Sequence, residues 1–357
     1  MKVYALFLPQ FHAIKENDEW WGEGFTEWKN VKNAKPLFHG HKQPLVPLNA
    51  NYYNLTNKET VYWQTDLMYK YGIDGLIYYH YYFNGKLLLE KPAENLLQWK
   101  DINQPFFFNW ANHSWFRSWE GSKELLIEQT YGGKVEWKHH FDYLLPFFKD
   151  DRYIKIDNKP VFMIYDPSFS EKNEMFNLFN SLCRENGFDG IYVVEECADM
   201  RMKEYHDFKE NLSSVTHKIY ITQPSAGKKL YIDSMSTFQN FLFRLNRKLA
   251  QYGLMKRVQK FEGEKMLSLI KENRISDELI IPGAFFGWDN TPRHGVRGSI
   301  ISEVSKEAFI DYMDSVAESN FVVINAWNEW AEGMMLEPTE EHRYKYLEWI
   351  QEWKNKK

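Results

Sequence analysis

Short apolar runs that end in polar and aromatic residues recur along this chain. The last is the clearest: residues 321–324 carry no charge, and residues 325–333 then hold two asparagines, two tryptophans and two glutamates. An uncharged run without polar alternation is typical of a strand buried on both faces. Strands that end in this way line the C-terminal mouth of a (β/α) barrel, where such barrels place their active sites.

Seven earlier segments show the same pattern. The expected strands are 3–8, 75–79, 105–108, 161–165, 190–194, 219–222 and 279–286, and helical spacing marks 58–71, 87–99, 135–148, 171–185 and 341–353. Eight alternations in 357 residues predict one α/β domain over 1–357, a (β/α)8 TIM barrel with long loops after its strands. A doubly wound open sheet would need a glycine-rich turn after its first strand, and residues 9–12 contain no glycine.

One segment departs from this alternation. Residues 228–260 hold eight Lys or Arg against the single acid Asp233, and we expect 228–273 to form a basic helical insert. Its apolar residues have amphipathic helical spacing beside basic ones: Phe238, Phe241, Leu242, Leu245 and Leu249, with Arg244, Arg247 and Lys248. Two interpretations stay open: a helix that covers the barrel or a partner, and peripheral contact of 232–262 with an anionic membrane or a lipid-linked saccharide.

Composition favours a carbohydrate ligand. Aromatic residues make up 17% of the chain, with 14 Trp and 22 Tyr, and many stand beside Asn, His, Asp or Glu. Aromatic faces stack on the C–H faces of sugars while polar neighbours bond the hydroxyls. The net charge of −5 argues against a nucleic-acid partner.

Other bulk features indicate the compartment. Two cysteines, Cys183 and Cys197, imply no disulfide framework and fit a reducing environment. Residues 1–8 are too short for a signal sequence, and no apolar run approaches the ~18 residues of a membrane span. We therefore expect a cytoplasmic location.

Glu329 and Glu332 are the predicted catalytic pair. On an extended strand they would face opposite ways, but if the chain coils after residue 324 they share a face, with Cβ atoms roughly 5–6 Å apart. That spacing is close to the ~5 Å carboxyl separation of retaining glycosidases and below the ~6.5–9.5 Å of inverting ones. A Glu-x-x-Glu pair is otherwise an ordinary solvated helix face. Here the aromatic surroundings would desolvate the acids, raise one pKa and prepare a general acid.

The other strand ends supply the rest of the predicted pocket. The candidate polar residues are His12, Tyr79, His80, Asn109, Asn112, Tyr165, Asp166, Glu195, Asp289, Asn290 and Asn328, with His80, Asn109 and Asp289 as hydroxyl ligands. The candidate stacking walls are Trp20, Trp21, Trp28, Trp115 and Trp288, and Trp330 joins the pocket beside the acids. We find no HExxH, Asp-x-Asp, Gly-x-Ser-x-Gly or P-loop pattern, so we expect no metal and no cofactor.

Several of these stretches resemble one known family, the WbsX-type proteins. The motifs are 23–28 (EGFTEW), 71–75 (YGIDG), 79–81 (YHY), 287–292 (GWDNTP) and 325–333 (NAWNEWAEG), and the resemblance covers about 2–200 and 280–350. WbsX-type proteins are glycosyltransferase WbsX or glycoside-hydrolase-family-99-like proteins of bacterial surface-polysaccharide clusters.

The resemblance implies a barrel similar to the family 99 endo-α-mannosidases, which carry an equivalent Glu-Trp-x-Glu. By this likeness Glu329 is the base on the sugar 2-hydroxyl, giving a 1,2-anhydro intermediate. Glu332 protonates the leaving oxygen and then activates water. The family's Trp-Ala-Asn-Glu-Asn-Trp reads differently at 110–115 of this chain, where His113 replaces the acid and alters the subsite that it lines.

Together these features predict a retaining carbohydrate-active enzyme. It would cleave or transfer at a mannoside-like glycosidic linkage of a bacterial surface oligosaccharide or polysaccharide, free or lipid-linked. Two alternatives stay open: a glycosyltransferase of capsule or O-antigen biosynthesis, and a glycan-binding barrel without catalysis.

Overall fold

The computed structural model describes residues 1–117, 124–252, 254 and 258–356, and a parallel sheet forms its centre. In sheet order the strands are β12 (Ile280–Ile281), β10 (Thr216–Ile221), β9 (Tyr192–Cys197), β8 (Lys159–Ile164), β4 (Phe106–Trp110), β2 (Gly75–Phe83), β1 (Lys2–Phe7), β16 (Phe321–Ile324) and β13 (Gly283–Ala284). The first and last are halves of one segment, interrupted at Pro282, which has no N–H to donate. The sheet therefore closes into a barrel of eight positions, and the predicted fold is confirmed.

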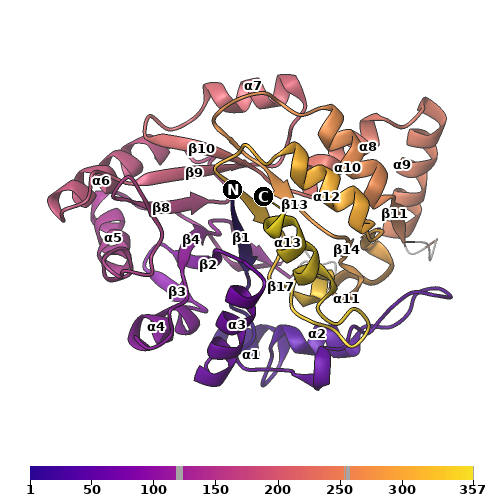
Figure 1. Ribbon diagram of the computed structural model, residues 1–357, viewed down its shortest axis with the longest axis horizontal. Helices are drawn as coiled ribbons and strands as arrows, with labels where there is room; N and C mark the ends of the chain where they lie inside the picture. The colour runs from indigo at the N-terminus through magenta and orange to yellow at the C-terminus, as the bar shows by residue number, and fades with distance from the viewer. Residues whose placement is uncertain (118–123, 253, 255–257, 357) are drawn as a thin grey trace.

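Helices follow every barrel strand and surround the sheet (Figure 1). They are α1 (Lys15–Trp21), α2 (Glu27–Asn33), α3 (Lys58–Lys70), α4 (Lys91–Gln98), α5 (Lys134–Phe148), α6 (Lys172–Glu185), α7 (Met202–Glu210), α8 (Ser225–Asp233), α9 (Thr237–Gln251), α10 (Gly263–Glu272), α11 (Thr291–His294), α12 (Lys306–Ser315) and α13 (Lys345–Asn355). In the part of the chain that the structure describes, none of them combines the length and apolar character needed to cross a bilayer.

Short elements decorate the loops between them. These are β3 (Lys86–Leu88), β5 (Trp115–Phe116), β6 (Leu125–Ile127), β7 (Lys155–Ile156), β11 (Gln259–Phe261), β14 (Trp288–Asp289), β15 (Ser299–Ile301), β17 (Asn328–Glu329), β18 (Met334–Met335), and the 3₁₀ turns η1 (Leu48–Ala50), η2 (Gly295–Arg297) and η3 (Trp330–Glu332).

Several elements differ from expectation, and three of these differences bear on the site and the insert. The segment after β1, expected as a loop, contains α1 and α2, which carry the three tryptophans of that segment. Strand β2 continues four residues beyond the predicted end at 79, and β4 extends to Trp110. The candidate residues His80 and Asn109 therefore lie within strands and not after them. The segment predicted as a basic insert, 228–273, includes α9, β11 and α10, while its residues 253 and 255–257 lie outside the described part of the chain.

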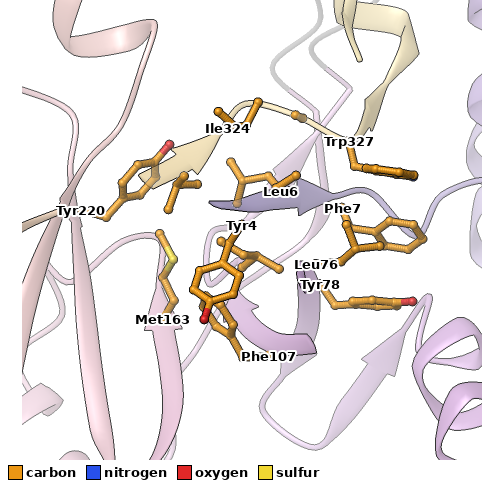
Figure 2. Packing of buried hydrophobic residues seen from close by; sticks show 14 of the residues in the cluster. Tyr4, Leu6, Phe7, Leu76, Tyr78, Phe107, Met163, Tyr220, Ile324 and Trp327 are labelled. Carbon is orange, nitrogen blue, oxygen red and sulfur yellow. The ribbon is translucent and has the colours of Figure 1, made fainter. Parts of the chain in front are cut away.

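The barrel interior is packed below the mouth, as Figure 2 shows. Side chains on one strand alternate between the inside and the outside of the barrel. Tyr4, Leu6, Phe107, Met163 and Tyr220 meet inside it, and the rings of Tyr4 and Phe107 lie 5.5 Å apart, edge to face. All five are buried, so the barrel is a filled core and a ligand can enter only above this layer.

Candidate active site

A cavity of about 440 Å³ opens above the packed layer, at the carboxyl ends of the strands. Its floor follows from the alternation, because the next inward residue on each strand is two positions further along the chain. Five strands supply such a floor residue: Leu8, Tyr79, Tyr165, Thr222 and Asn325. The floor of the cavity is therefore a single layer of inward-pointing side chains, one from each of these five strands.

Glu329 and Glu332 open into this cavity together. Glu329 ends β17, and η3 follows at once, so the tight turn brings residues three apart to one side of the chain. Both carboxylates contact Arg293 of α11: Nη2 lies 3.2 Å from Oε2 of Glu329, and Nη1 donates to Oε1 of Glu332. The indole Nε1 of Trp288 donates to the other Glu332 oxygen at 2.9 Å. The two acids therefore share one guanidinium.

A third carboxylate joins the cluster from α2. Glu27 is fully buried, and its Oε1 lies 3.1 Å from Nη2 of Arg293. Burial opposes the charged form of Arg293, but the three carboxylates outweigh it and raise the pKa of the guanidinium further above its ordinary value. Arg293 is therefore a permanent cation that orients the acids.

Burial raises the pKa of Glu329 above its ordinary value. The Arg293 charge opposes this rise, and the like charges of Glu332 and Glu27 add to it. Sequence reasoning expected the raised pKa on a general acid, whereas here it belongs to the residue that the family likeness makes the base. A carboxylate with a raised pKa is a stronger base once it is ionised.

The strand that carries the acids is anchored beneath the cavity by Glu337. This carboxylate is buried and accepts hydrogen bonds from the indoles of Trp327 at 2.9 Å and Trp330 at 2.7 Å. It also accepts from Tyr53 and Gln64, both at 2.7 Å. Burial outweighs these four donors and raises the pKa of Glu337 to about 7. The tryptophans of the motif thus fix the backbone around Glu329.

Aromatic side chains form the walls of the cavity. Trp21, Trp115 and Trp288 line it, together with Tyr79, Tyr81 and Tyr165 on the strand side. Burial, followed by the charges of Glu196 and Glu329, raises the pKa of Tyr79 well above its ordinary value, so its hydroxyl stays protonated. The hollow therefore combines flat apolar faces with hydroxyl groups, as a sugar site requires.

A further buried acid, Glu196, lies in the same inward register at the end of β9. Strand pairing sets it beside Tyr220, and its carboxyl accepts hydrogen bonds from the Asn109 amide and, at 2.8 Å, from the Thr222 hydroxyl. Both partners are neutral. Burial raises the pKa of Glu196 to about 8, and the two hydrogen bonds only partly offset that rise.

The raised pKa of Glu196 predicts a pH-dependent stability. Between pH 4.5 and about 8 the folded protein holds a proton that the unfolded chain has released, so stability falls as pH rises. At roughly 1.4 kcal/mol per pKa unit, Glu196→Gln should remove about 3 kcal/mol of the difference in unfolding free energy between pH 5 and pH 8. Urea unfolding at both pH values measures it. The exposed control Glu174→Gln should keep the wild-type difference, and an unchanged difference in Glu196→Gln would contradict the assignment.

Two candidate residues face away from the cavity because they are strand neighbours of inward residues. His80, next to Tyr79, points outward to α5, where its Nε2 lies 2.8 Å from Nε2 of His140, and burial lowers its pKa to about 3. Glu195, next to Glu196, pairs with Lys172 of α6 at 2.8 Å. Neither lines the cavity, so the structure corrects their proposed role as ligands of a sugar in it.

The remaining candidates lie outside the cavity lining, and their side chains contact other parts of the protein. Asn109 is buried against Glu196, Asn112 holds the Asp166 backbone, and Asn328 bonds the backbone of Leu8. Trp28 and Trp330 pack together in the core, and Trp20 backs Trp115. The Asp289 carboxylate forms hydrogen bonds with His41 and Gln43. The side-chain oxygen of Asn290 accepts a hydrogen bond from the Ser299 N–H. His12 is buried, and this burial lowers its pKa to about 4. In the described residues, the candidates that do line the cavity are Trp21, Tyr79, Trp115, Tyr165, Trp288, Glu329 and Glu332.

Sequence reasoning missed the residues that hold the acids. Arg293 stands one position beyond the quoted motif 287–292, and Glu27 lies inside the motif 23–28 without having been proposed for the site. A lone basic residue after a strand end and an acid between aromatic residues were the available signals. Strand alternation could have shown that only one of Glu195 and Glu196 faces inward, but residues 190–194 are all uncharged and do not show which one.

Comparison with known proteins gives a family and a fold. A family model described as "Glycosyltransferase WbsX" matches residues 3–350. Two curated relatives, both the uncharacterized protein WxcX from strains of Xanthomonas campestris pv. campestris, are 28% identical over 370 residues. The alignments cover 97% of this chain and 48% of each relative, so the chain spans about half the length of these relatives.

Among solved structures, the GH99 endo-alpha-mannosidase from Bacteroides thetaiotaomicron superposes with a TM-score of 0.55 at 15% identity, covering 99% of this chain and 96% of that one. A glycoside hydrolase-like protein superposes with a TM-score of 0.62 at 12% identity, covering 99% and 93%. At these identities the likeness shows a shared barrel fold.

Proposed function

Because the chain belongs to the glycosyltransferase WbsX family, we propose that it is a carbohydrate-active enzyme of the family-99-like type, with Glu329 and Glu332 as its catalytic pair. One observation carries the proposal: both acids open into an aromatic-walled cavity at the mouth of the barrel while sharing the Arg293 guanidinium. The substrate would be a mannoside-like linkage of a bacterial surface glycan, and the reaction would retain anomeric configuration.

The proposed reaction has two steps. The Glu329 carboxylate takes the proton of the sugar 2-hydroxyl, and O2 attacks C1 while the protonated Glu332 gives its proton to the departing glycosidic oxygen. The product is a 1,2-anhydro sugar. The Glu332 carboxylate then takes a proton from water, the water oxygen attacks C1 and opens the three-membered ring, and Glu329 returns its proton to O2.

The surroundings of each acid suit its role. Glu329 is 8% exposed, and its raised pKa gives the ionised form the basicity needed to approach a sugar hydroxyl. Glu332 is more open and faces the cavity, where a leaving oxygen or a water molecule can reach it. Arg293 balances the negative charge as the proton moves between sugar and enzyme.

Transfer differs from hydrolysis only in the second step, where an acceptor hydroxyl replaces water. The description of the family, glycosyltransferase WbsX, supports transfer to an acceptor. The structural neighbours, which are an endo-alpha-mannosidase and a glycoside hydrolase-like protein, support hydrolysis. A barrel that binds glycans without catalysis would need the walls but not the paired acids, so the shared guanidinium favours an enzyme.

A trapped complex followed by product analysis tests the proposal. An array of bacterial surface oligosaccharides and α-manno-oligosaccharides, screened with Glu332→Gln protein, should identify the bound glycan. Wild-type protein should then convert that glycan, with and without an acceptor sugar, as followed by mass spectrometry and by NMR of the new anomeric centre. A free reducing sugar of retained configuration indicates hydrolysis, and an extended acceptor indicates transfer. Tight binding with no product under either condition would leave only a binding barrel and refute the enzyme.

A further inference from the structure

Helix α9 turns its apolar face away from the protein. Phe238, Phe241, Leu242 and Leu245 have the i, i+3, i+4, i+7 spacing of one helix face, and their exposed fractions are 69%, 60%, 38% and 40%. The half-buried inner stripe instead is half polar, since it consists of Asn240, Phe243, Asn246 and Leu249. An amphipathic helix that only covers a barrel would have the opposite orientation.

Exposed apolar side chains are concentrated in this segment. Of the thirteen large apolar side chains exposed in the described part of the chain, six lie between Phe238 and Leu254. Tyr252 and Leu254, exposed by 70% and 75%, extend the face beyond the C-terminal end of the helix. Such a patch marks a surface that contacts something apolar.

All the charged residues of the same segment are basic. Residues 234–261 contain no Asp or Glu, while α9 carries Arg244, Arg247 and Lys248. At 100° per residue, Arg244 and Lys248 flank the exposed apolar face on one side, and both are exposed. An apolar face bordered by cations is the arrangement with which a helix lies in the plane of an anionic bilayer surface.

Helix α9 is also joined to the wall of the cavity. It packs against η2, which directly follows the helix of Arg293, and against β11. On the inner side of α9, the ring of Phe243 lies 5.7 Å from that of Phe261. The Nζ atom of Lys228, on α8, lies 5.0 Å from the ring centre of Phe261 and 4.6 Å from that of Trp288, which lines the cavity. Figure 1 shows α9 at the margin of the molecule, outside α8.

We propose that the exposed face of α9 docks on a bilayer surface rich in anionic lipid, with Phe238, Phe241 and Leu245 entering the acyl boundary and the helix cations meeting the headgroups. A second copy of the chain is a poorer occupant, because face-to-face helices would bring Arg244 and Lys248 of both copies to one seam, and residues 234–261 offer no acid to separate them. The proposal does not depend on the catalytic assignment.

Flotation with vesicles tests this docking. At low salt the full chain should float with vesicles of equal parts phosphatidylglycerol and phosphatidylcholine, stay in solution with pure phosphatidylcholine, and be released from the anionic vesicles at high salt. The triple variants Phe238→Ser/Phe241→Ser/Leu245→Ser and Arg244→Gln/Arg247→Gln/Lys248→Gln should each weaken binding by roughly tenfold or more.

Matched controls remove the same chemistry elsewhere. Val135→Ser/Met202→Ser removes side chains that are 67% and 55% exposed, and Lys134→Gln/Lys138→Gln/Lys203→Gln makes the same change in net charge. Both controls should bind like wild type. Failure of wild type to float with anionic vesicles, or equal losses in the controls, would overturn the proposal. So would a dimer in sedimentation equilibrium that the apolar triple variant dissociates, because the face would then bind a second copy.

Discussion

Replacing Arg293 with methionine is expected to destabilise the protein by about 3–5 kcal/mol, the range measured when one partner of a buried ion pair is removed. The guanidinium contacts Glu27, Glu329 and Glu332, and without it these three carboxylates lose their counter-charge. Protonation can relieve this, so the loss should be larger at pH 8 than at pH 5. Urea unfolding at both pH values measures it.

Two further variants make the Arg293 experiment specific. Arg343→Met removes a side chain that is 64% exposed, and should change stability by about 1 kcal/mol or less. Adding Glu27→Gln to Arg293→Met removes one stranded carboxylate and should recover part of the stability. If Arg293→Met is no more harmful than Arg343→Met, the cluster does not hold the site together.

Glu329→Gln and Glu332→Gln should each lower turnover by ~10²-fold or more while leaving glycan affinity nearly unchanged, since the amide keeps the shape but cannot exchange the proton. Turnover of the wild type should rise with pH as Glu329 ionises, and the raised pKa of Glu329 places this rise above the ordinary range of a carboxyl group. Steady-state kinetics across pH, with isothermal titration for affinity, measures both effects.

The exposed acid Glu307 provides a control for the proposed catalytic pair, because Glu307→Gln should leave turnover unaltered. The residual activity of Glu329→Gln should lack the rise with pH. A fall in wild-type turnover over the same pH range would exchange the roles of the two acids, and full activity in either variant would remove it from the mechanism.

The sequence was sufficient for the barrel and for much of the cavity wall, because both depend on local patterns. Uncharged runs predicted the strands, and the aromatic residues in the segments that follow them included Trp21, Trp115 and Trp288, which line the cavity. Strand ends were harder to place. We predicted that β2 ends at residue 79, whereas it ends at residue 83. With the earlier end, both Tyr79 and His80 were expected to line the pocket. Because neighbouring residues on a strand point to opposite faces, only one of them can point into the barrel.

The supporting contacts could not be derived in this way, because they join residues far apart in the sequence. Glu27 and Arg293 are separated by 266 positions, and Gln64 and Glu337 by 273. No local pattern indicates that an acid from α2 and a base from α11 meet beside Glu329 and Glu332. Likewise Trp28 and Trp330 resemble stacking walls in sequence, and only the packing shows that they stack on each other.

The Glu337 carboxylate and its four donors bear on how this site can diversify. They fix the acid-bearing strand from the core side, whereas Trp21 and Trp115 stand on α1 and on the short β5–β6 pair at the surface. Substitutions at that rim reshape the hollow without disturbing the core anchor of the acid-bearing strand. If the proposed function holds, descendants of such a barrel can change the glycan that they bind by altering the rim alone, while Glu329, Glu332 and their anchor stay the same.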